Sequence, residues 1–179
     1  MGRPARTPGG CAVTAAALRA RLARPLPLLL ALLALTYGVA AVGALAAADA
    51  GDVYLGLRRP GWAPPAWLFG PVWTVLYASI AVAAWLVVRH GRADGRGRRP
   101  ALTRWAVQLL LNLAWTPLFF AAGQYGAALV EICLLLVSIG FTVAAFARVY
   151  RPAAYLLLPY LLWVAYAAVL NGAIWWLNR

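Results

Sequence analysis

Aromatic and amide side chains recur at helical spacing in three apolar stretches of this chain. Residues spaced by about three, four, seven or eight positions fall on one face of a helix. Flat rings on such a face stack on a planar ligand, and a few amides orient that ligand by hydrogen bonding. The three faces are Phe69, Trp73, Tyr77 and Ile80; Gln108, Asn112, Trp115 and Phe119; and Trp163, Ala167, Asn171, Ile174 and Asn178.

The amides on these faces allow a second interpretation. An unpaired amide at membrane depth is unfavourable, so Gln108, Asn112 and Asn171 are expected to point inward and to bond to each other, to backbone or to a ligand. Any one amide taken alone more often serves to join helices by a hydrogen bond than to bind a ligand. Because each amide shares its face with a large ring, a ligand pocket becomes an equally good interpretation. The tryptophans expected in that pocket lie deep in their stretches: Trp73, Trp115 and Trp163.

Residues for ordinary enzyme chemistry are sparse. Glu131 is the one carboxylate inside an apolar stretch, where an acid is a functional candidate. Its position about two turns from the start of that stretch favours a structural role. His90 lies in a basic loop, and Cys11 and Cys133 lack metal-ligand spacing. Without a nucleophile, metal cluster or acid–base pair, the sequence predicts a binding protein with no catalytic residue and no metal site.

The elements that carry these residues are expected to be membrane helices. The chain of 179 residues is 65% hydrophobic and 11% charged, with a mean hydropathy of +0.79, whereas soluble domains have about 25% charged residues. A membrane span takes roughly 20 apolar residues, so the expected fold is an all-α membrane protein with a bundle of five transmembrane helices. We expect a basic, disordered tail over 1–24 and a transmembrane domain over 25–179, with helices over about 26–48, 67–88, 102–122, 125–147 and 153–177.

The net charge of +12 comes entirely from arginine. Arginines gather in the tail, between the second and third helices, and between the fourth and fifth helices. The positive-inside rule therefore places the N-terminus in the cytoplasm and the C-terminus outside. Anionic lipid head groups explain the charge, and no nucleic-acid partner is expected. A cleaved signal peptide is the alternative for the first helix. Its 23 apolar residues, however, exceed the roughly 7 to 15 that are usual in the apolar region of a signal peptide.

The connection before the second helix has an unusual composition. Between Pro60 and Tyr77, eighteen residues include three Trp, four Pro and one Phe. Such a segment forms a rigid aromatic surface at a membrane boundary. Further along the chain, Pro117 and Pro159 lie inside expected helices and are predicted to bend them.

These features together resemble the TspO/MBR family, the tryptophan-rich sensory proteins related to the mitochondrial translocator protein. The resemblance covers about residues 37–178. The matching positions are Tyr54 to Pro60, Pro64-Pro65, Trp67, Phe69 to Thr74, Leu76-Tyr77, Gln108, Asn112, Trp115, Phe119-Phe120, Pro159-Tyr160, Trp163, Leu170-Asn171 and Leu177-Asn178.

The resemblance implies a five-helix bundle, often a homodimer in membrane lipid, that binds tetrapyrroles such as protoporphyrin IX and haem as ligands and requires no cofactor. It also implies a pocket beneath the connection between the first two helices. Arg59 stands where the family usually has Lys and keeps a positive charge that pairs with a porphyrin propionate. The pocket residues carried over by motif are Tyr54, Trp67, Phe69, Trp73, Asn112, Trp115, Trp163 and Ala167.

Several functions are compatible with that resemblance. The leading one is a receptor or sensor that binds a porphyrin and influences porphyrin handling or stress regulation. The alternatives are light- and oxygen-dependent porphyrin degradation and the transport of porphyrins or sterols. The sterol pattern of animal relatives requires a Tyr between Leu or Val and Arg, and the end of this chain, LNGAIWWLNR, has none.

Overall fold

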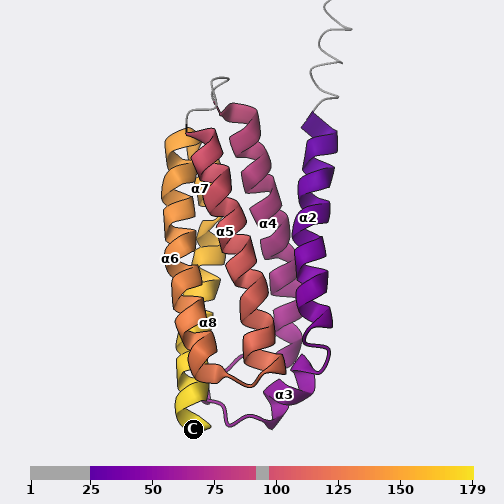
Figure 1. The fold of residues 1–179 in the computed structure, drawn as a ribbon, viewed down its shortest axis with the longest axis vertical. Helices are drawn as coiled ribbons and strands as arrows, with labels where there is room; N and C mark the ends of the chain where they lie inside the picture. Colours follow the sequence, from indigo (N-terminus) through magenta and orange to yellow (C-terminus); the bar gives the residue numbers. More distant parts are fainter. Residues whose placement is uncertain (1–24, 92–96) are drawn as a thin grey trace, which may run out of the picture.

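The part of the chain that the structure describes is helical, with short connections and no strand (Figure 1). It is a computed structural model that describes residues 25–91 and 97–179, so the tail expected over 1–24 lies outside it. The long helices run alongside one another, and α3 lies at the end of the bundle away from the start of α2 (Figure 1). The elements are α2 (Pro25–Leu45), α3 (Ala50–Gly56), η1 (Ala66–Leu68), α4 (Phe69–His90), α5 (Arg98–Thr116), η2 (Pro117–Ala121), α6 (Tyr125–Val149), α7 (Arg151–Tyr155) and α8 (Leu158–Leu177).

Four stretches of helix are long and apolar enough to cross a membrane. They are Leu26–Leu45, Ala66–His90, Tyr125–Val149 and Arg151–Leu177, with mean hydropathies of 2.3, 1.9, 2.4 and 1.9. The remaining long helix, α5, carries Arg98, Arg99 and Arg104 in its first turns, and these charges lower its hydropathy. Hydropathy therefore supports four of the five expected spans and does not establish α5 as the fifth.

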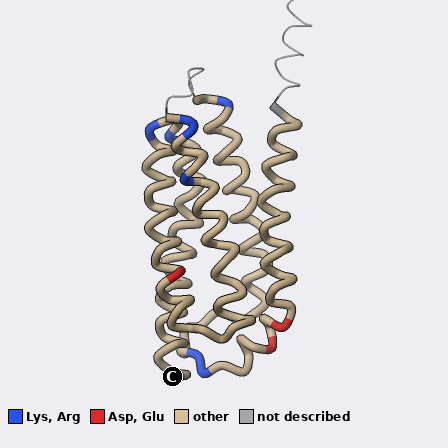
Figure 2. The backbone as a smooth tube through the Cα atoms, in the orientation of Figure 1, with Lys and Arg blue, Asp and Glu red and all other residues tan. Residues whose placement is uncertain are grey.

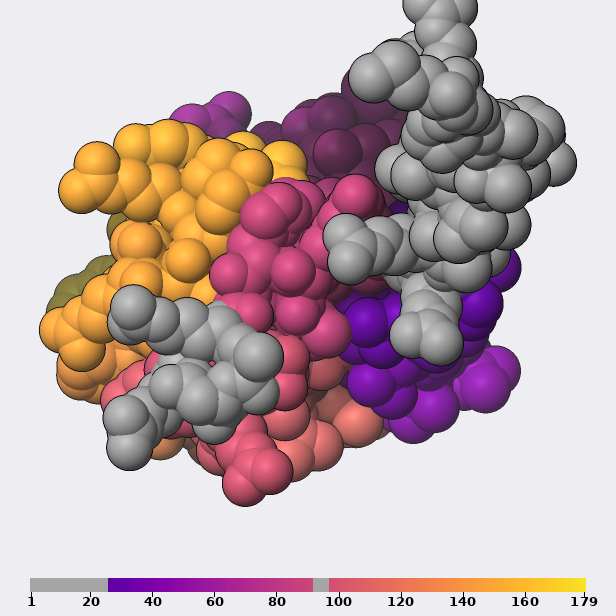
Figure 3. Space-filling model, turned by 90° about the horizontal axis from the view of Figure 1, so that it is seen from above, coloured from indigo at the N-terminus to yellow at the C-terminus, as the bar shows by residue number. Residues whose placement is uncertain are grey.

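Helices α4 to α8 form the tightly packed part of the bundle, and α2 lies at its edge. The α6 helix packs on α5 and α8, while α2 packs mainly on α4 and to a lesser extent on α5. Seen from above, α2 and the helices α6 to α8 lie on opposite sides of the molecule (Figure 3). Ile80, Phe146 and Tyr160 are fully buried in the core, whereas Leu30 and Leu35 of α2 are more than half exposed. The exposed apolar side chains of α2 are suited to lipid contact.

Pro117 divides the third predicted helix, over 102–122, at the position where a bend was predicted. Because Pro117 lacks an N–H, α5 ends at Thr116 and the chain continues as the π-helical η2. The N–H groups of Ala122 and Gln124 donate to the carbonyls of Pro117 and Leu118, at 2.9 and 3.0 Å. A π-helical turn contains an additional residue, so it rotates the following aromatic side chains away from their α-helical positions.

The last predicted helix, over 153–177, is also divided, and the division lies next to Pro159, which was predicted to bend it. The break falls at Leu156 and Leu157, between α7 and α8, so Pro159 is the second residue of α8 and does not bend its interior. At that position the missing N–H needs no partner within the helix.

Charged residues separate to the two ends of the bundle (Figure 2). One end carries arginines at the end of α4, the start of α5, and the junction of α6 and α7. The opposite end carries Asp49 and Asp52 beside α3, followed by Arg58 and Arg59. Between the two ends α6 carries the buried Glu131, and the low number of charges over this length is what a bilayer-spanning protein requires.

Candidate ligand-binding site

A cavity of about 500 Å³ lies inside the bundle near α3. Its volume falls in the range of roughly 300 to 1,000 Å³ that small-molecule sites occupy. One wall comes from α2 and the residues after it, and consists largely of small side chains. The opposite walls come from α4, α5 and α8 and are aromatic. The small-residue wall includes Val39, Ala40, Gly43, Ala44, Ala47, Ala48, Ala50 and Gly51.

Three rings of α4 line the cavity in a row. Phe69, Trp73 and Tyr77 follow each other at intervals of four residues, so one helix face presents all three. The Trp73 and Tyr77 ring centroids are 5.5 Å apart with planes tilted by 34°, and the Trp73 ring meets that of Tyr160 edge-on at 6.2 Å. These contacts fix the ring orientations in the absence of any occupant.

The α5 side of the cavity combines an amide with an indole. The Asn112 amide nitrogen donates to the hydroxyl of Tyr77 at 2.9 Å, and both residues line the cavity. Trp115 lies three residues further along α5. Its indole N–H donates a hydrogen bond to the side-chain carbonyl oxygen of Asn171 at 3.1 Å. Asn112 and Trp115 are therefore held in place by α4 and α8.

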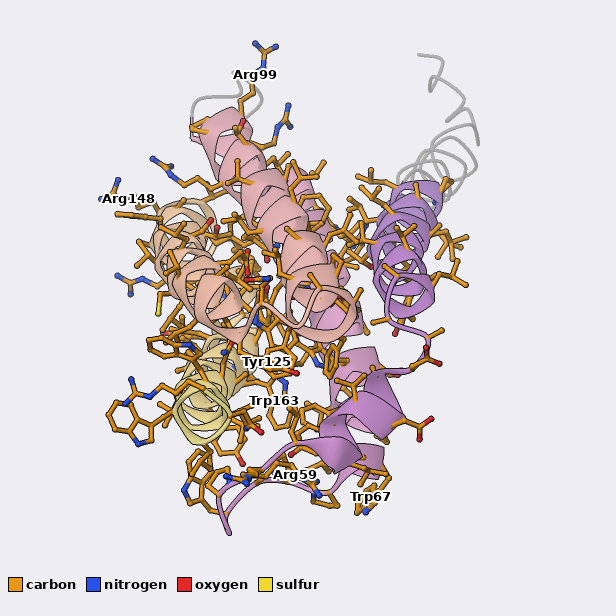
Figure 4. The ribbon with its side chains drawn as sticks, turned by 60° about the horizontal axis from the view of Figure 1, so that its bottom comes forward. Arg59, Trp67, Arg99, Tyr125, Arg148 and Trp163 are labelled. Carbon is orange, nitrogen blue, oxygen red and sulfur yellow. The ribbon has the colours of Figure 1, made fainter. Side chains whose placement is uncertain are left out.

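The α8 side presents Trp163 and Ala167, spaced by one turn. The Trp163 ring stands edge-on to the Phe69 ring, with 6.0 Å between their centroids, and Figure 4 shows Trp163 inside the bundle. Its indole nitrogen is buried and has no hydrogen-bond partner among the described residues. A buried N–H without a partner is unfavourable, and a small rotation of the ring would bring this group to an acceptor on a ligand.

Tyr54 closes the cavity at the α3 end. It is 3% exposed and its hydroxyl donates to the Pro64 carbonyl at 2.8 Å, which ties α3 to the proline-rich connection. Burial raises the pKa of the Tyr54 hydroxyl above its usual value, and the nearby Arg59 guanidinium partly opposes that rise. The hydroxyl thus stays protonated and remains a donor at neutral pH.

Arg59 lies next to this closing residue and outside the cavity lining. Its guanidinium carbon is 4.6 Å from the centroid of the Tyr54 ring, a cation–π arrangement. Figure 4 shows Arg59 on the connection that crosses this end of the bundle. The structure therefore places a cation beside the residue that closes the cavity at the α3 end.

The connection from Leu57 to Pro65 is also fastened to α8. The side chain of Asn178 accepts a hydrogen bond from the Arg58 N–H at 3.0 Å and donates one to the Arg58 carbonyl at 2.9 Å. The Tyr166 hydroxyl donates to the Trp62 carbonyl at 3.1 Å, and the two rings meet edge-on. Side chains from the last helix therefore hold the connection over this end of the bundle.

Besides Arg59, four of the residues expected in the pocket lie outside the main cavity. Trp67 is 71% exposed on η1 and points away from the bundle (Figure 4). Its place in the pocket was expected from the family motif, whereas in the structure the tighter η1 turn before α4 directs Trp67 outward. Gln108 is buried and its side-chain oxygen accepts a hydrogen bond from the Tyr160 hydroxyl at 2.8 Å. Phe119 and Asn171 pack behind Trp115 and line a separate hollow of about 20 Å³.

Sequence reasoning missed the α2 wall and underrated Tyr77. The α2 residues had only one signal, a run of alanine and glycine between Val39 and Gly51 within a mostly leucine-rich span. Small residues in a membrane helix permit close approach of a neighbouring group. Tyr77 lay on a predicted face but was not assigned to the site, although its hydroxyl is the partner of Asn112.

Fold and site together define an integral membrane protein whose helices enclose an aromatic cavity near one end of the bundle. Comparison with known sequences agrees, because residues 30–177 match the model of the TspO/MBR family. The chain is 43% identical over 125 residues to the tryptophan-rich protein TspO of Chlorobaculum tepidum, covering 70% of this chain and 78% of that protein. It is 39% identical over 122 residues to the human translocator protein, covering 68% and 72%, and 35% identical over 144 residues to a tryptophan-rich sensory protein of Cereibacter sphaeroides, covering 80% and 87%. This chain belongs to the TspO/MBR family.

Proposed function

We propose that this protein is a membrane receptor or sensor that binds a tetrapyrrole, such as protoporphyrin IX or haem, in the cavity beneath the proline-rich connection. The observation that carries the proposal is the cavity of about 500 Å³ with aromatic walls from α4, α5 and α8 and the buried, unpartnered indole N–H of Trp163. A large planar aromatic ligand fits that chemistry because its faces stack on rings and its few polar atoms accept hydrogen bonds.

The charge distribution around the site supports an acidic ligand. Within the described residues, the cavity lining contains no charged side chain. Arg59 lies beside Tyr54 at its end. A porphyrin with its ring system in the cavity and a propionate near Arg59 would leave no charge buried without a partner. Benzodiazepine-like or sterol ligands lack such a carboxylate, so they make no use of this arginine.

The proposal includes the membrane arrangement of the chain. We place α5 across the bilayer as a fifth span, since it packs along α6 and its arginines gather at the same end as those of α4 and α7. Under the positive-inside rule that end is cytoplasmic, and the connection over the cavity is outside. On the family resemblance we also propose a homodimer in contact with anionic lipid.

Tryptophan fluorescence tests the binding proposal. Purified protein in detergent is titrated with protoporphyrin IX, and quenching gives the dissociation constant. A Trp73→Ala, Trp163→Ala double variant removes two walls of the cavity, and we expect at least a tenfold loss of affinity because two stacking contacts of about 1 kcal/mol each disappear.

The matched control is Trp67→Phe, which changes a tryptophan on the same segment but outside the cavity. Its affinity should equal that of the wild type. Equal affinities for the wild type and the double variant would reject the cavity as the binding site. A loss caused by Trp67→Phe would instead place the ligand against the outer surface of the connection.

A further inference from the structure

A small polar cluster lies in the core beside the cavity and outside its lining. It consists of Glu131 on α6, Gln108 on α5 and Tyr160 on α8, which are 8%, 1% and 0% exposed. None of the three lines the cavity, although Ile132, the residue after Glu131, does. The cluster is therefore separated from the proposed ligand by one layer of side chains.

The hydrogen bonds of this cluster are incomplete. The Tyr160 hydroxyl donates to the Gln108 carbonyl oxygen at 2.8 Å. The Gln108 amide nitrogen and both carboxyl oxygens of Glu131 are buried without a partner among the described residues. Tyr160 also lies within electrostatic reach of Glu131 and Tyr77. The Tyr160 hydroxyl is thus bonded to an amide that has an unused donor, and it lies within electrostatic reach of a carboxyl that has unused acceptors.

No counter-ion compensates a negative charge on Glu131. Within the described residues no cationic side chain acts on its carboxyl. Arg148, at the other end of α6, is about 25 Å away along the helix at 1.5 Å per residue. The groups packed around α6 are the neutral phenols Tyr160 on α8 and Tyr77 on α4, and the uncharged amides Gln108 and Asn112 on α5. An unpaired carboxylate in such surroundings is unfavourable, and the neutral acid is favoured.

We propose that Glu131 is an internal proton-binding site of this protein. The carboxyl is protonated at neutral pH within the membrane, and a water molecule links it to the amide nitrogen of Gln108. That water accepts from the Gln108 N–H and donates to one Glu131 oxygen, which gives the amide nitrogen and that oxygen one partner each. Ionisation releases one proton and turns the neutral acid into a carboxylate. The site does not depend on which ligand fills the cavity.

The sequence offers an unusually clean test, because Glu131 is the only glutamate in the chain; the other three acidic residues are Asp49, Asp52 and Asp94. Protein labelled with carbon-13 at the glutamate side-chain carboxyl is placed in lipid nanodiscs and studied by isotope-edited infrared spectroscopy across pH. The wild type itself reports on Glu131, so the result does not require a folded variant.

We expect the labelled band of the protonated acid to persist at pH 7, where solvent-exposed carboxyls are ionised since their pKa values are about 4. Glu131→Gln should lack this band, and Asp52→Asn, a change at an exposed carboxyl, should retain it. A labelled band that is already that of a carboxylate at pH 7 would overturn the proposal.

A second variant tests the link to Gln108. Gln108→Leu removes the amide that holds the water, and we expect the Glu131 acid band to shift toward the frequency of an unbonded carboxyl. Thr103→Val is the matched control on an exposed face of the same helix. An unchanged Glu131 band in Gln108→Leu would rule out the water link, whatever ligand the protein binds.

Discussion

Trp163 has one polar group, and the fold leaves that group unused. Its indole N–H is buried without a partner among the described residues, while the N–H of Trp115 is bonded to Asn171. The two tryptophans therefore differ in role despite similar depth. Trp115 fastens α5 to α8, and Trp163 is free to bond to an occupant of the cavity.

Replacing Trp163 with Phe separates stacking from hydrogen bonding. The ring is retained and the N–H is lost, so protoporphyrin IX should bind about fivefold to tenfold more weakly, the effect of one hydrogen bond of about 1 kcal/mol. Without ligand, the melting temperature of the variant should fall only by the effect of the smaller ring, because the buried N–H has no hydrogen bond to lose. Calorimetric Kd values and melting temperatures measure the two effects.

The contrasting control is Trp115→Phe. This change leaves the Asn171 carbonyl oxygen without its donor, so its main effect should be a lower melting temperature. If Trp163→Phe lowers thermal stability as much as Trp115→Phe does, then Trp163 has a structural partner and is not a reserved ligand contact.

At this scale the sequence predicted most of the aromatic residues that line the cavity, and its omissions have local causes. Helical spacing correctly grouped Phe69 with Trp73, and Asn112 with Trp115, because both pairs lie in uninterrupted α-helix. Trp67, expected in the pocket from the family motif, lies on a short turn of tighter winding before α4, and no residue pattern marks where one winding changes to the other. The orphaned groups at Glu131 and Gln108 depend on distances between helices, which spacing along one helix does not contain.

At the scale of elements, the connection between α3 and η1 depends on α8. Asn178 makes two hydrogen bonds to the backbone of Arg58, and these bonds join parts of the chain that are 120 residues apart. The connection has no regular secondary structure of its own over most of its length, so its position relies on these side chains.

Asn178→Ala should loosen this connection without unfolding the bundle. Each lost bond contributes about 1 kcal/mol, so amide exchange over residues 57–65 should become faster by roughly tenfold, while exchange in α6 stays the same. Hydrogen–deuterium exchange with mass spectrometry measures both regions at once. Asn178→Asp keeps the acceptor for the Arg58 N–H, and an intermediate effect is expected. Unchanged exchange in Asn178→Ala would mean that Tyr54 and Tyr166 alone hold the connection.

Helix boundaries were less predictable than helix existence. The apolar stretches indicated long helices in each of the five expected regions, and helices occur there. Both prolines predicted to bend helices lie at or next to interruptions of different kinds: Pro117 starts a π-helical segment, and Pro159 is the second residue of α8 after a break. A proline removes an N–H at any position. Packing against neighbouring helices decides whether the helix bends, changes to a π-helix or ends and is followed by a new helix.

At the scale of the whole molecule, the membrane arrangement can be tested at three exposed sites. A chain carrying Cys11→Ser and Cys133→Ser receives a single cysteine at Asp52, Arg99 or Gln124. If α5 spans the bilayer and the basic end is cytoplasmic, a membrane-impermeant thiol reagent should label intact cells at positions 52 and 124 but not at 99. Lysed cells, in which each site should react, provide the control.

Each alternative gives a distinct labelling pattern. Labelling at 99 alone would invert the orientation. Labelling at 52 but not at 124 would show that α5 does not cross, which would leave four spans. Hydropathy does not distinguish these outcomes, because Arg98, Arg99 and Arg104 lower the value for α5 whether it spans the bilayer or lies at its surface.

The small-residue wall of α2 has a mechanical consequence. Alanine and glycine have no rotamers to adjust, so the width of the cavity on that side is set by where the α2 backbone stands. That helix touches only one flank of the bundle and turns bulky side chains toward the acyl chains. Bilayer thickness influences the tilt of a helix that has few neighbours, so it would change the width of the cavity and the thickness of the ligand that fits it. Lipid composition thereby becomes a determinant of ligand selectivity.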